Sequence, residues 1–367
     1  MRVADAPRTT DPENGTGRAA RRPGLDALRG LALLLVMLNH AHPGVFGAAG
    51  MLGVTLFFTL SGFLITGLLL RELERTGGVR YGRFFLARLL RLLPPLLLVL
   101  AGYAVVEGGF DHGAGRTLVG DTLLTGLTYT MNLPFVPHGS GSMYHLWTLA
   151  TEEQFYLVWP LVLALAWRRR TVRRVIVAGI ALALLACAAT LVHQGPETAR
   201  VYALPTSWAS ALLIGCGIRV VQDRATALLP TAPRARLLLG AALTALLLLG
   251  AGLPAQGDHP WTYLITLPAV ALGSGVLVLL AWTARPALGA HPVIRLFALL
   301  GTISYAAYLW NLPVQSWLGD PRTLIGGVTG AALTIAAATV SWWLVERPAA
   351  RLRRRLTARA GAPAPAA

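Results

Sequence analysis

Charged residues are scarce in this chain of 367 residues: they make up only 13% of it, and lysine is absent altogether. Soluble domains carry about a quarter of their residues as charged side chains, so this composition excludes an ordinary soluble domain. Hydrophobic residues account for 55% of the chain. We therefore expect a polytopic membrane protein. Arginine supplies all the positive charge in place of lysine, which together with abundant Ala, Gly and Leu indicates GC-rich coding of the actinobacterial kind.

Cysteine is also scarce, with only Cys187 and Cys216, and both lie inside apolar runs. Small buried hydrophobic residues are ordinary there, so we predict neither a disulfide framework nor a metal site. Acidic residues are half as numerous as basic ones, which leaves a net charge of +16. The arginines cluster in short segments between apolar runs, as in cytoplasmic loops, so we expect no nucleic-acid partner.

Ten apolar segments are long enough, at about 20 residues each, to cross a bilayer. They cover residues 25–41, 51–70, 90–106, 145–167, 173–192, 202–219, 237–253, 261–282, 296–315 and 324–345. Arginine-rich connections follow the even-numbered segments, and the positive-inside rule then places both termini in the cytoplasm. The sequence predicts an all-α, multi-pass helix bundle of about ten transmembrane helices in the inner (plasma) membrane.

Residues 117–131 fit this count poorly, because they are only moderately apolar and about 15 residues long. We interpret them as an interfacial or re-entrant helix on the outer side. The predicted organisation is a disordered cytoplasmic tail over residues 1–23, a membrane domain over 24–348, and a basic, Ala/Pro-rich cytoplasmic tail over 349–367.

Arg29 and His40 both lie on the first apolar segment. Eleven helical residues turn through about 1100°, roughly 20° past three full turns, so the two side chains share one face about 16 Å apart. Ionisable residues in lipid cost several kcal/mol unless they face protein or water, which indicates a buried polar cavity. Taken singly, Arg29 could snorkel and His40 could sit at the interface. Histidine is nevertheless the usual general base at neutral pH.

Glu152 and Glu153 begin the fourth segment from the outer side. Adjacent helical residues point about 100° apart, so at most one of these carboxylates can face the same cavity squarely. The pair either complements the helix dipole or supplies one carboxylate that orients His40. We favour Glu152 for that second role.

Three further residues have two interpretations each. Ser61, beside Gly62 near mid-membrane, indicates either close helix packing or the wall of a tunnel for a thioester or acyl chain. Arg88 and Arg91 are neighbours on one helical face, and guanidinium groups bind phosphate oxygens bidentately. They are either topogenic charges or a site for a nucleotide-bearing thioester such as coenzyme A.

Taken together, these motifs resemble the acyltransferase-3 family of integral membrane acyltransferases, which O-acylate sugars, O-antigen, exopolysaccharides and macrolides. The resemblance covers roughly residues 24–350, in the segments 24–40, 53–66, 84–94, 146–156, 304–310 and 346–348. One departure is Asn311, where many members carry a histidine. An amide cannot act as a base there and can only form hydrogen bonds.

The resemblance implies an O-acyltransferase that moves an acyl group, expected to be acetyl, from acyl-CoA to a hydroxyl. The acceptor would be a carbohydrate, a polysaccharide or a glycosylated small molecule. Acyl-CoA is a donor substrate in this picture, and no cofactor is permanently bound. The implied catalytic residues are His40 as general base, Arg29 and Glu152; the implied donor-binding residues are Arg88, Arg91 and Ser61.

A transporter or flippase for a sugar or lipid-linked intermediate is the alternative class, because transporters also bury charged residues at midplane. Transporters commonly show paired repeats and broken helices, and neither is evident in this sequence. A purely structural membrane scaffold is a third class, for which His40 would be dispensable.

Overall fold

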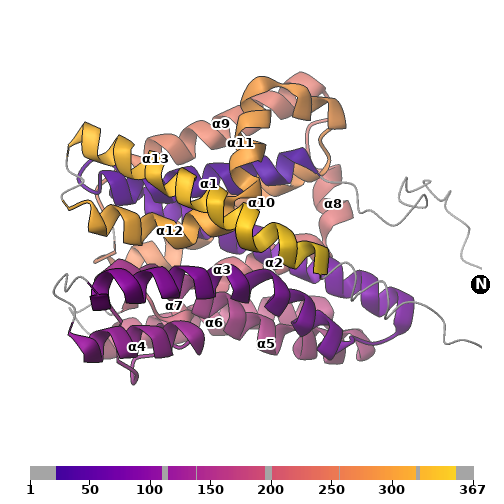
Figure 1. The fold of residues 1–367 in the computed structure, drawn as a ribbon. Helices are drawn as coiled ribbons and strands as arrows, with labels where there is room; N and C mark the ends of the chain where they lie inside the picture. The colour runs from indigo at the N-terminus through magenta and orange to yellow at the C-terminus, as the bar shows by residue number, and fades with distance from the viewer. Residues whose placement is uncertain are drawn as a thin grey trace, which may run out of the picture.

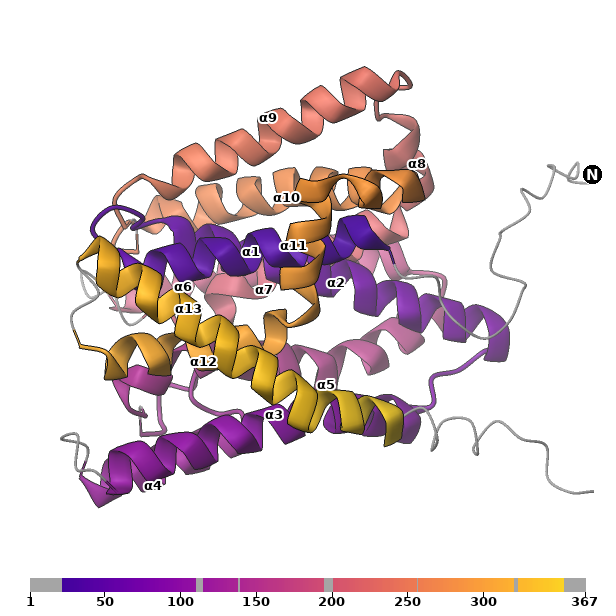
Figure 2. The same cartoon turned by 45° about the horizontal axis from the view of Figure 1, so that its top comes forward.

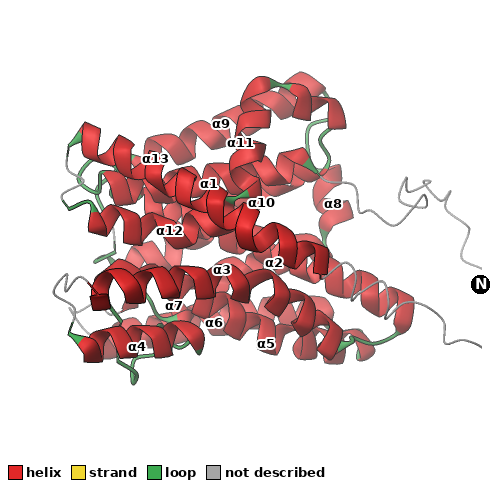
Figure 3. Ribbon diagram, viewed as in Figure 1, coloured by secondary structure: helices red, strands yellow, loops and turns green. Residues whose placement is uncertain are grey.

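The computed structural model describes residues 22–109, 115–137, 139–194, 201–255, 257–319 and 323–352. Within these ranges the secondary structure is helical and contains no strand (Figure 3). The all-α prediction is therefore confirmed for the described part of the chain. The predicted tails, 1–23 and 349–367, lie outside the described residues except for 22–23 and 349–352.

Long helices make up the body of the fold, and short helical turns connect them. The first half contains α1 (Pro23–Ala41), α2 (Ala49–Thr76), α3 (Tyr81–Gly109), α4 (Arg116–Leu127), η1 (Gly141–Leu146), α5 (Trp147–Arg168) and α6 (Val172–Gln194). The second half contains α7 (Pro205–Val220), α8 (Gln222–Ala227), α9 (Pro233–Ala251), η3 (Thr262–Thr266), α10 (Leu267–Trp282), η4 (Pro286–Ala290), α11 (Pro292–Thr302), α12 (Ser304–Trp317), α13 (Leu324–Ser341) and η5 (Trp342–Glu346).

Many of these helices are long and apolar enough to cross a membrane. Among the described residues there are seven such helices, or up to eight if the bent pair α11 and α12 forms one span. The sequence predicts ten spans. The two predicted spans without such a helix are those that correspond to α5 and α7. The structure therefore supports a multi-pass membrane protein. The helix α4 has 12 residues, or about 18 Å, too short for a straight crossing.

The helix bundle brings both ends of the described chain to one side. In Figures 1 and 2 the start of α1, the end of α2 and the end of α13 all lie toward the right. This side also carries Arg22, whose guanidinium stacks 3.7 Å from the Trp282 ring and donates to the Trp282 carbonyl at 2.7 Å. We call it the arginine-rich end, and the side holding the α1–α2 loop and α4 the opposite end.

Two pairs of glycines let the central helices approach closely. A Cβ on Gly30 of α1 would lie 2.0 Å from the Phe297 carbonyl oxygen of α11, and one on Gly301 would lie 1.8 Å from the Asp26 carbonyl oxygen. A Cβ on Gly62 of α2 would similarly lie 2.0 Å from the Leu212 carbonyl oxygen of α7, and one on Gly215 of α7 would lie 2.1 Å from the Thr59 carbonyl oxygen of α2. The packing interpretation of the Ser61-Gly62 pair is thus confirmed for the glycine.

The predicted span 296–315 is broken in the structure. Helices α11 and α12 meet at 73°, with Ile303 as the single residue between them. The hydroxyls of Thr302 and Ser304, on either side of the break, donate to backbone carbonyls three residues earlier, which competes with the helical ladder. The sequence reasoning found no broken helix, and on this point it was wrong.

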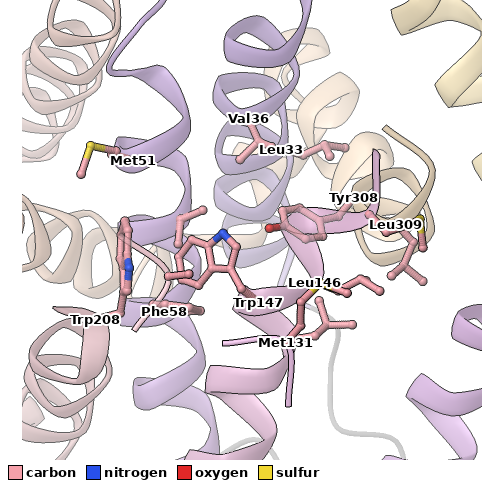
Figure 4. Packing of buried hydrophobic residues seen from close by; sticks show 14 of the residues in the cluster. Leu33, Val36, Met51, Phe58, Met131, Leu146, Trp147, Trp208, Tyr308 and Leu309 are labelled. Carbon is pink, nitrogen blue, oxygen red and sulfur yellow. The ribbon is translucent and has the colours of Figure 1, made fainter. Parts of the chain in front are cut away.

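An aromatic cluster joins α2, α5 and α7 in the middle of the bundle. The rings of Trp147 and Trp208 have centroids 5.0 Å apart, and Phe58 meets both edge-on at 6.3 and 5.8 Å. Figure 4 shows this packing, with Tyr308 and Leu309 of α12 in the same cluster. The cluster fixes the start of α5 against α2, and so positions the segment that carries Glu152.

Candidate active site

A cavity of about 1270 Å³ lies between α2, α3, α5 and α12 and contains most of the residues that the sequence singles out. Five of the six predicted site residues line it: Arg29, Ser61, Arg88, Arg91 and Glu152. Seven arginines and three glutamates line the cavity in all. Its wall is therefore cationic, which suits an anionic ligand. The sixth predicted residue, His40, is not in the wall.

Arg29 faces this cavity from α1, one turn after Asp26. Its Nη1 atom lies 3.2 Å from Asp26 Oδ1, as i,i+3 helical neighbours can. Asp26 is itself buried, so the pair holds the guanidinium in place and neutralises part of its charge. Arg29 also interacts electrostatically with Arg91 and Tyr156 across the cavity.

Arg88 is held by an acid that the sequence analysis did not choose. Its Nη2 atom lies 2.6 Å from Glu153 Oε1, and its guanidinium stacks 3.5 Å from the centre of the Tyr156 ring. Burial, followed by the Glu153 carboxylate, raises the pKa of Tyr129, in the loop after α4, to about 12. Its hydroxyl is therefore neutral. Glu153 points away from the cavity that Glu152 lines, as their 100° separation predicts.

Glu152 is the acid that faces the cavity. Its Oε1 atom accepts a hydrogen bond of 3.3 Å from the Tyr156 hydroxyl, and the Ser61 side chain lies beside both groups. Among the described residues, no hydrogen bond or ion pair joins Glu152 to His40. The structure therefore places Glu152 with Ser61 and Tyr156 in the cavity wall and does not make it the partner of His40.

His40 pairs with an amide from α12. Its Nδ1 atom lies 2.5 Å from Asn311 Oδ1, and the two residues are 271 positions apart in the chain. An amide oxygen only accepts hydrogen bonds, so Nδ1 carries the proton and Nε2 of the neutral ring keeps its lone pair. This is the tautomer that a general base needs. Asn311, the residue at which the chain departs from the family that it resembles, is thus the residue that orients His40.

Sequence reasoning missed a second histidine, His145 of η1. It is 3% exposed, and its Nε2 atom lies 3.1 Å from the Leu309 carbonyl oxygen. It is also close enough to His40 for the two rings to interact electrostatically. The available signal was an ionisable side chain at the start of the apolar segment 145–167.

Tyr308 and Thr148 stand between the cavity and the two histidines. Both residues line the cavity, and the Tyr308 hydroxyl lies 2.7 Å from Thr148 Oγ1. The same hydroxyl donates to the His145 carbonyl at 3.2 Å, and the Tyr308 and His145 rings are 5.3 Å apart. The cavity thus ends next to His145, and neither His145 nor His40 is in its wall.

Neither metal ligation nor a disulfide is seen in the part of the chain that the structure describes. No group of three His, Cys, Asp or Glu side chains there could hold a metal ion. Cys187 and Cys216 are both buried and free.

With this geometry in view, comparison with known proteins decides the family. The sequence profile of an acyltransferase domain matches residues 22–347. The chain belongs to the acyltransferase-3 family. The family is described as an acyltransferase domain, and the transporter alternative has no support in these matches.

Curated relatives include two longer bacterial proteins. The chain is 30% identical over 347 residues to the putative peptidoglycan O-acetyltransferase YrhL of Bacillus subtilis, covering 89% of this chain and 54% of that protein. It is 29% identical over 357 residues to the peptidoglycan O-acetyltransferase OatA of Listeria monocytogenes, covering 91% and 57%. The chain therefore spans little more than half the length of these relatives. No solved structure matches it.

Proposed function

We propose that this protein is a membrane O-acetyltransferase that takes acetyl from acetyl-CoA and esterifies a hydroxyl of a carbohydrate. The observation that carries the proposal is the cationic cavity, which extends from the arginine-rich end toward His40. The bond to Asn311 leaves the Nε2 atom of the neutral His40 ring unprotonated, as a general base requires. The names of the relatives support an acetyl group and a carbohydrate acceptor.

The charge of the cavity wall supports an anionic donor such as acetyl-CoA. Arg91 lines the wall and makes no ion pair among the described residues, so its guanidinium is available for the phosphates of coenzyme A. Arg88, fixed by Glu153, adds a positioned cation. The extended pantetheine arm would carry the thioester past Ser61 and Glu152 toward Tyr308 and Thr148.

The proposed reaction uses His40 as the base. Nε2 removes the proton of the acceptor hydroxyl as its oxygen attacks the thioester carbonyl. The carbon–sulfur bond then breaks, the proton passes from His40 to the leaving thiolate, and the products are the acetyl ester and free CoA. Asn311 holds the ring by accepting from Nδ1–H throughout. Movement of the Tyr308 side chain would let the thioester meet His40.

We further propose that the arginine-rich end faces the cytoplasm and that the protein lies in the plasma membrane. Acetyl-CoA is made in the cytoplasm, and the positive-inside rule gives the same orientation. Residues 24–348 would then form the whole catalytic membrane domain, close to the 22–347 range of the family match.

The direct test is acetyl transfer by the purified protein in lipid vesicles. We expect the wild-type protein to move radiolabelled acetyl from acetyl-CoA to a glycan or glycoside, and His40→Ala to lower the rate at least a hundredfold, in the range of general-base contributions. The matched control is His193→Ala, which removes an exposed histidine at the end of α6.

Two results would contradict the proposal. One is wild-type protein that transfers no acetyl to any hydroxyl acceptor while the vesicles transport the sugar. The other is a fully active His40→Ala variant that inserts and unfolds like the wild type.

A further inference from the structure

Two buried polar atoms beside His40 have no hydrogen-bond partner in the described part of the structure. They are Nδ1 of His145 and Nδ2 of Asn311. His145 is 3% exposed and Asn311 is 0% exposed. They come from different elements, η1 and α12, which pack against each other through the bond between His145 and the Leu309 carbonyl.

The two atoms have complementary hydrogen-bonding roles. A carbonyl oxygen only accepts, so the bond to Leu309 fixes the proton of the neutral His145 ring on Nε2 and leaves Nδ1 as an acceptor. In Asn311 the oxygen is used by His40, so Nδ2 is a free donor. Together with His40 Nε2, the site offers two acceptors and one donor.

The histidine is also held firmly in place. The His145 carbonyl accepts from Thr148 Oγ1 at 2.9 Å and from the Tyr308 hydroxyl at 3.2 Å. A buried polar atom without a partner is costly in an apolar bundle, and it is most costly when the side chain cannot turn away. A group that both donates and accepts would satisfy these atoms, and an acyl chain or an aromatic ring would not.

We infer that His145 and Asn311 form a recognition site for further hydroxyls of a polyhydroxylated acceptor, next to the hydroxyl that His40 activates. This inference rests on the proposed function and specifies the acceptor. The reacting hydroxyl donates to His40 Nε2, a neighbouring hydroxyl donates to His145 Nδ1, and an acceptor oxygen takes the proton of Asn311 Nδ2. The site therefore selects sugars over simple alcohols.

The experiment compares two acceptors and two variants of the full chain in vesicles with acetyl-CoA. The acceptors are a methyl glycoside, with several hydroxyls, and cyclohexylmethanol, with one. His145→Gln places its amide nitrogen near the Nε2 position, so it can keep the Leu309 bond while losing the Nδ1 acceptor. His145→Asn places an amide oxygen near Nδ1 and gives up the Leu309 bond.

For His145→Gln we expect the KM of the glycoside to rise about tenfold, because the variant loses one hydrogen bond to the acceptor. A tenfold change corresponds to about 1.4 kcal/mol. The KM of acetyl-CoA and the rate with cyclohexylmethanol should not change. For His145→Asn we expect a glycoside KM within about threefold of the wild-type value, since the acceptor atom is restored. A purely structural role predicts the opposite order, because only His145→Gln keeps the Leu309 bond.

An unchanged preference for the glycoside in His145→Gln overturns the inference and shows that Nδ1 faces only water. Loss of activity toward both acceptors alike, with a lowered unfolding temperature in both variants, overturns it in favour of a structural role. Failure of the wild-type protein to acetylate either acceptor refutes the proposed function itself and is distinguishable from both.

Discussion

The side chain paired with His40 is a neutral amide, that of Asn311. A carboxylate such as Glu152 would stabilise the imidazolium that forms when a histidine takes up a proton. The Asn311 amide orients the ring and fixes its tautomer but supplies no charge. In the proposed mechanism, a protonated His40 would therefore have no carboxylate to stabilise its charge and would pass its proton on to the leaving thiolate.

Arg88 and Arg91, two arginines of the cavity wall, differ in their partners. Arg88 is neutralised by Glu153 and stacked on Tyr156, so it is a fixed part of the wall. Arg91, three residues on and in the same wall, forms no ion pair within the described residues. Of the two arginines that the sequence singled out, Arg91 is thus the one whose charge is available to a ligand.

Arg91→Ala should raise the KM of acetyl-CoA by about ten- to a hundredfold, because one charge-assisted hydrogen bond to a phosphate contributes about 1.5–3 kcal/mol. The KM of the acceptor should not change. The measurement is initial-rate kinetics with acetyl-CoA and, in parallel, with acetyl-pantetheine, which has no phosphates.

With acetyl-pantetheine as the donor, Arg91→Ala should have the same KM for the donor as the wild-type protein. Arg173→Ala, an exposed arginine of α6 outside the cavity wall, serves as the matched control with both donors. An equal loss with both donors would show that Arg91 does not bind phosphate.

Among the helices, α2 contributes to two different surfaces through the neighbouring residues Ser61 and Gly62. Ser61 lines the cavity, and Gly62, about 100° around α2, lies against the backbone of α7. The two interpretations of this pair are therefore compatible. Close packing of α2 on α7 brings the cavity wall to its position.

Gly62→Ala should destabilise the protein by about 1–3 kcal/mol, the usual effect of overpacking, because its Cβ would lie 2.0 Å from a backbone oxygen that cannot turn away. The measurement is thermal or denaturant unfolding in detergent, followed by tryptophan fluorescence.

The control is Gly120→Ala in α4, where a Cβ would meet nothing within 4 Å. It should be neutral or stabilise by up to about 1 kcal/mol, since alanine favours helix over glycine. Equal unfolding curves for Gly62→Ala and the wild type would refute close packing of α2 on α7.

At the scale of the whole molecule, the orientation of the bundle decides where donor and acceptor enter. The arginines of the cavity lie toward the arginine-rich end, and His40 lies at the last turn of α1, near the opposite end. A donor from the cytoplasm and an acceptor from outside would then meet inside the bundle.

Labelling of single introduced cysteines should reveal this orientation, because the native Cys187 and Cys216 are buried and should not react with the reagent. Val45→Cys, at an exposed position in the α1–α2 loop, should react with a membrane-impermeant maleimide in intact cells. Thr76→Cys, at the end of α2, should react only in inverted vesicles. The reversed labelling pattern would invert the proposed topology.

The sequence by itself determined the helical class, the multi-pass membrane character and the faces of individual helices, because these depend on composition and on the 3.6-residue period. Of the residues that it singled out, Arg29, Ser61, Arg88, Arg91 and Glu152 line one cavity, whereas His40 lies outside the cavity wall. It also predicted that only one of Glu152 and Glu153 would face that cavity.

Only the tertiary structure decided which side chains meet. The Arg88–Glu153 pair joins residues 65 positions apart, and the His40–Asn311 pair joins residues 271 apart. Such contacts depend on how helices cross and on the 73° break at Ile303, which brings α12 beside α1. The 3.6-residue period of the sequence carries no information about helix crossings or about this break. The partner of His40 and the proposed role of His145 therefore became visible only in the folded chain.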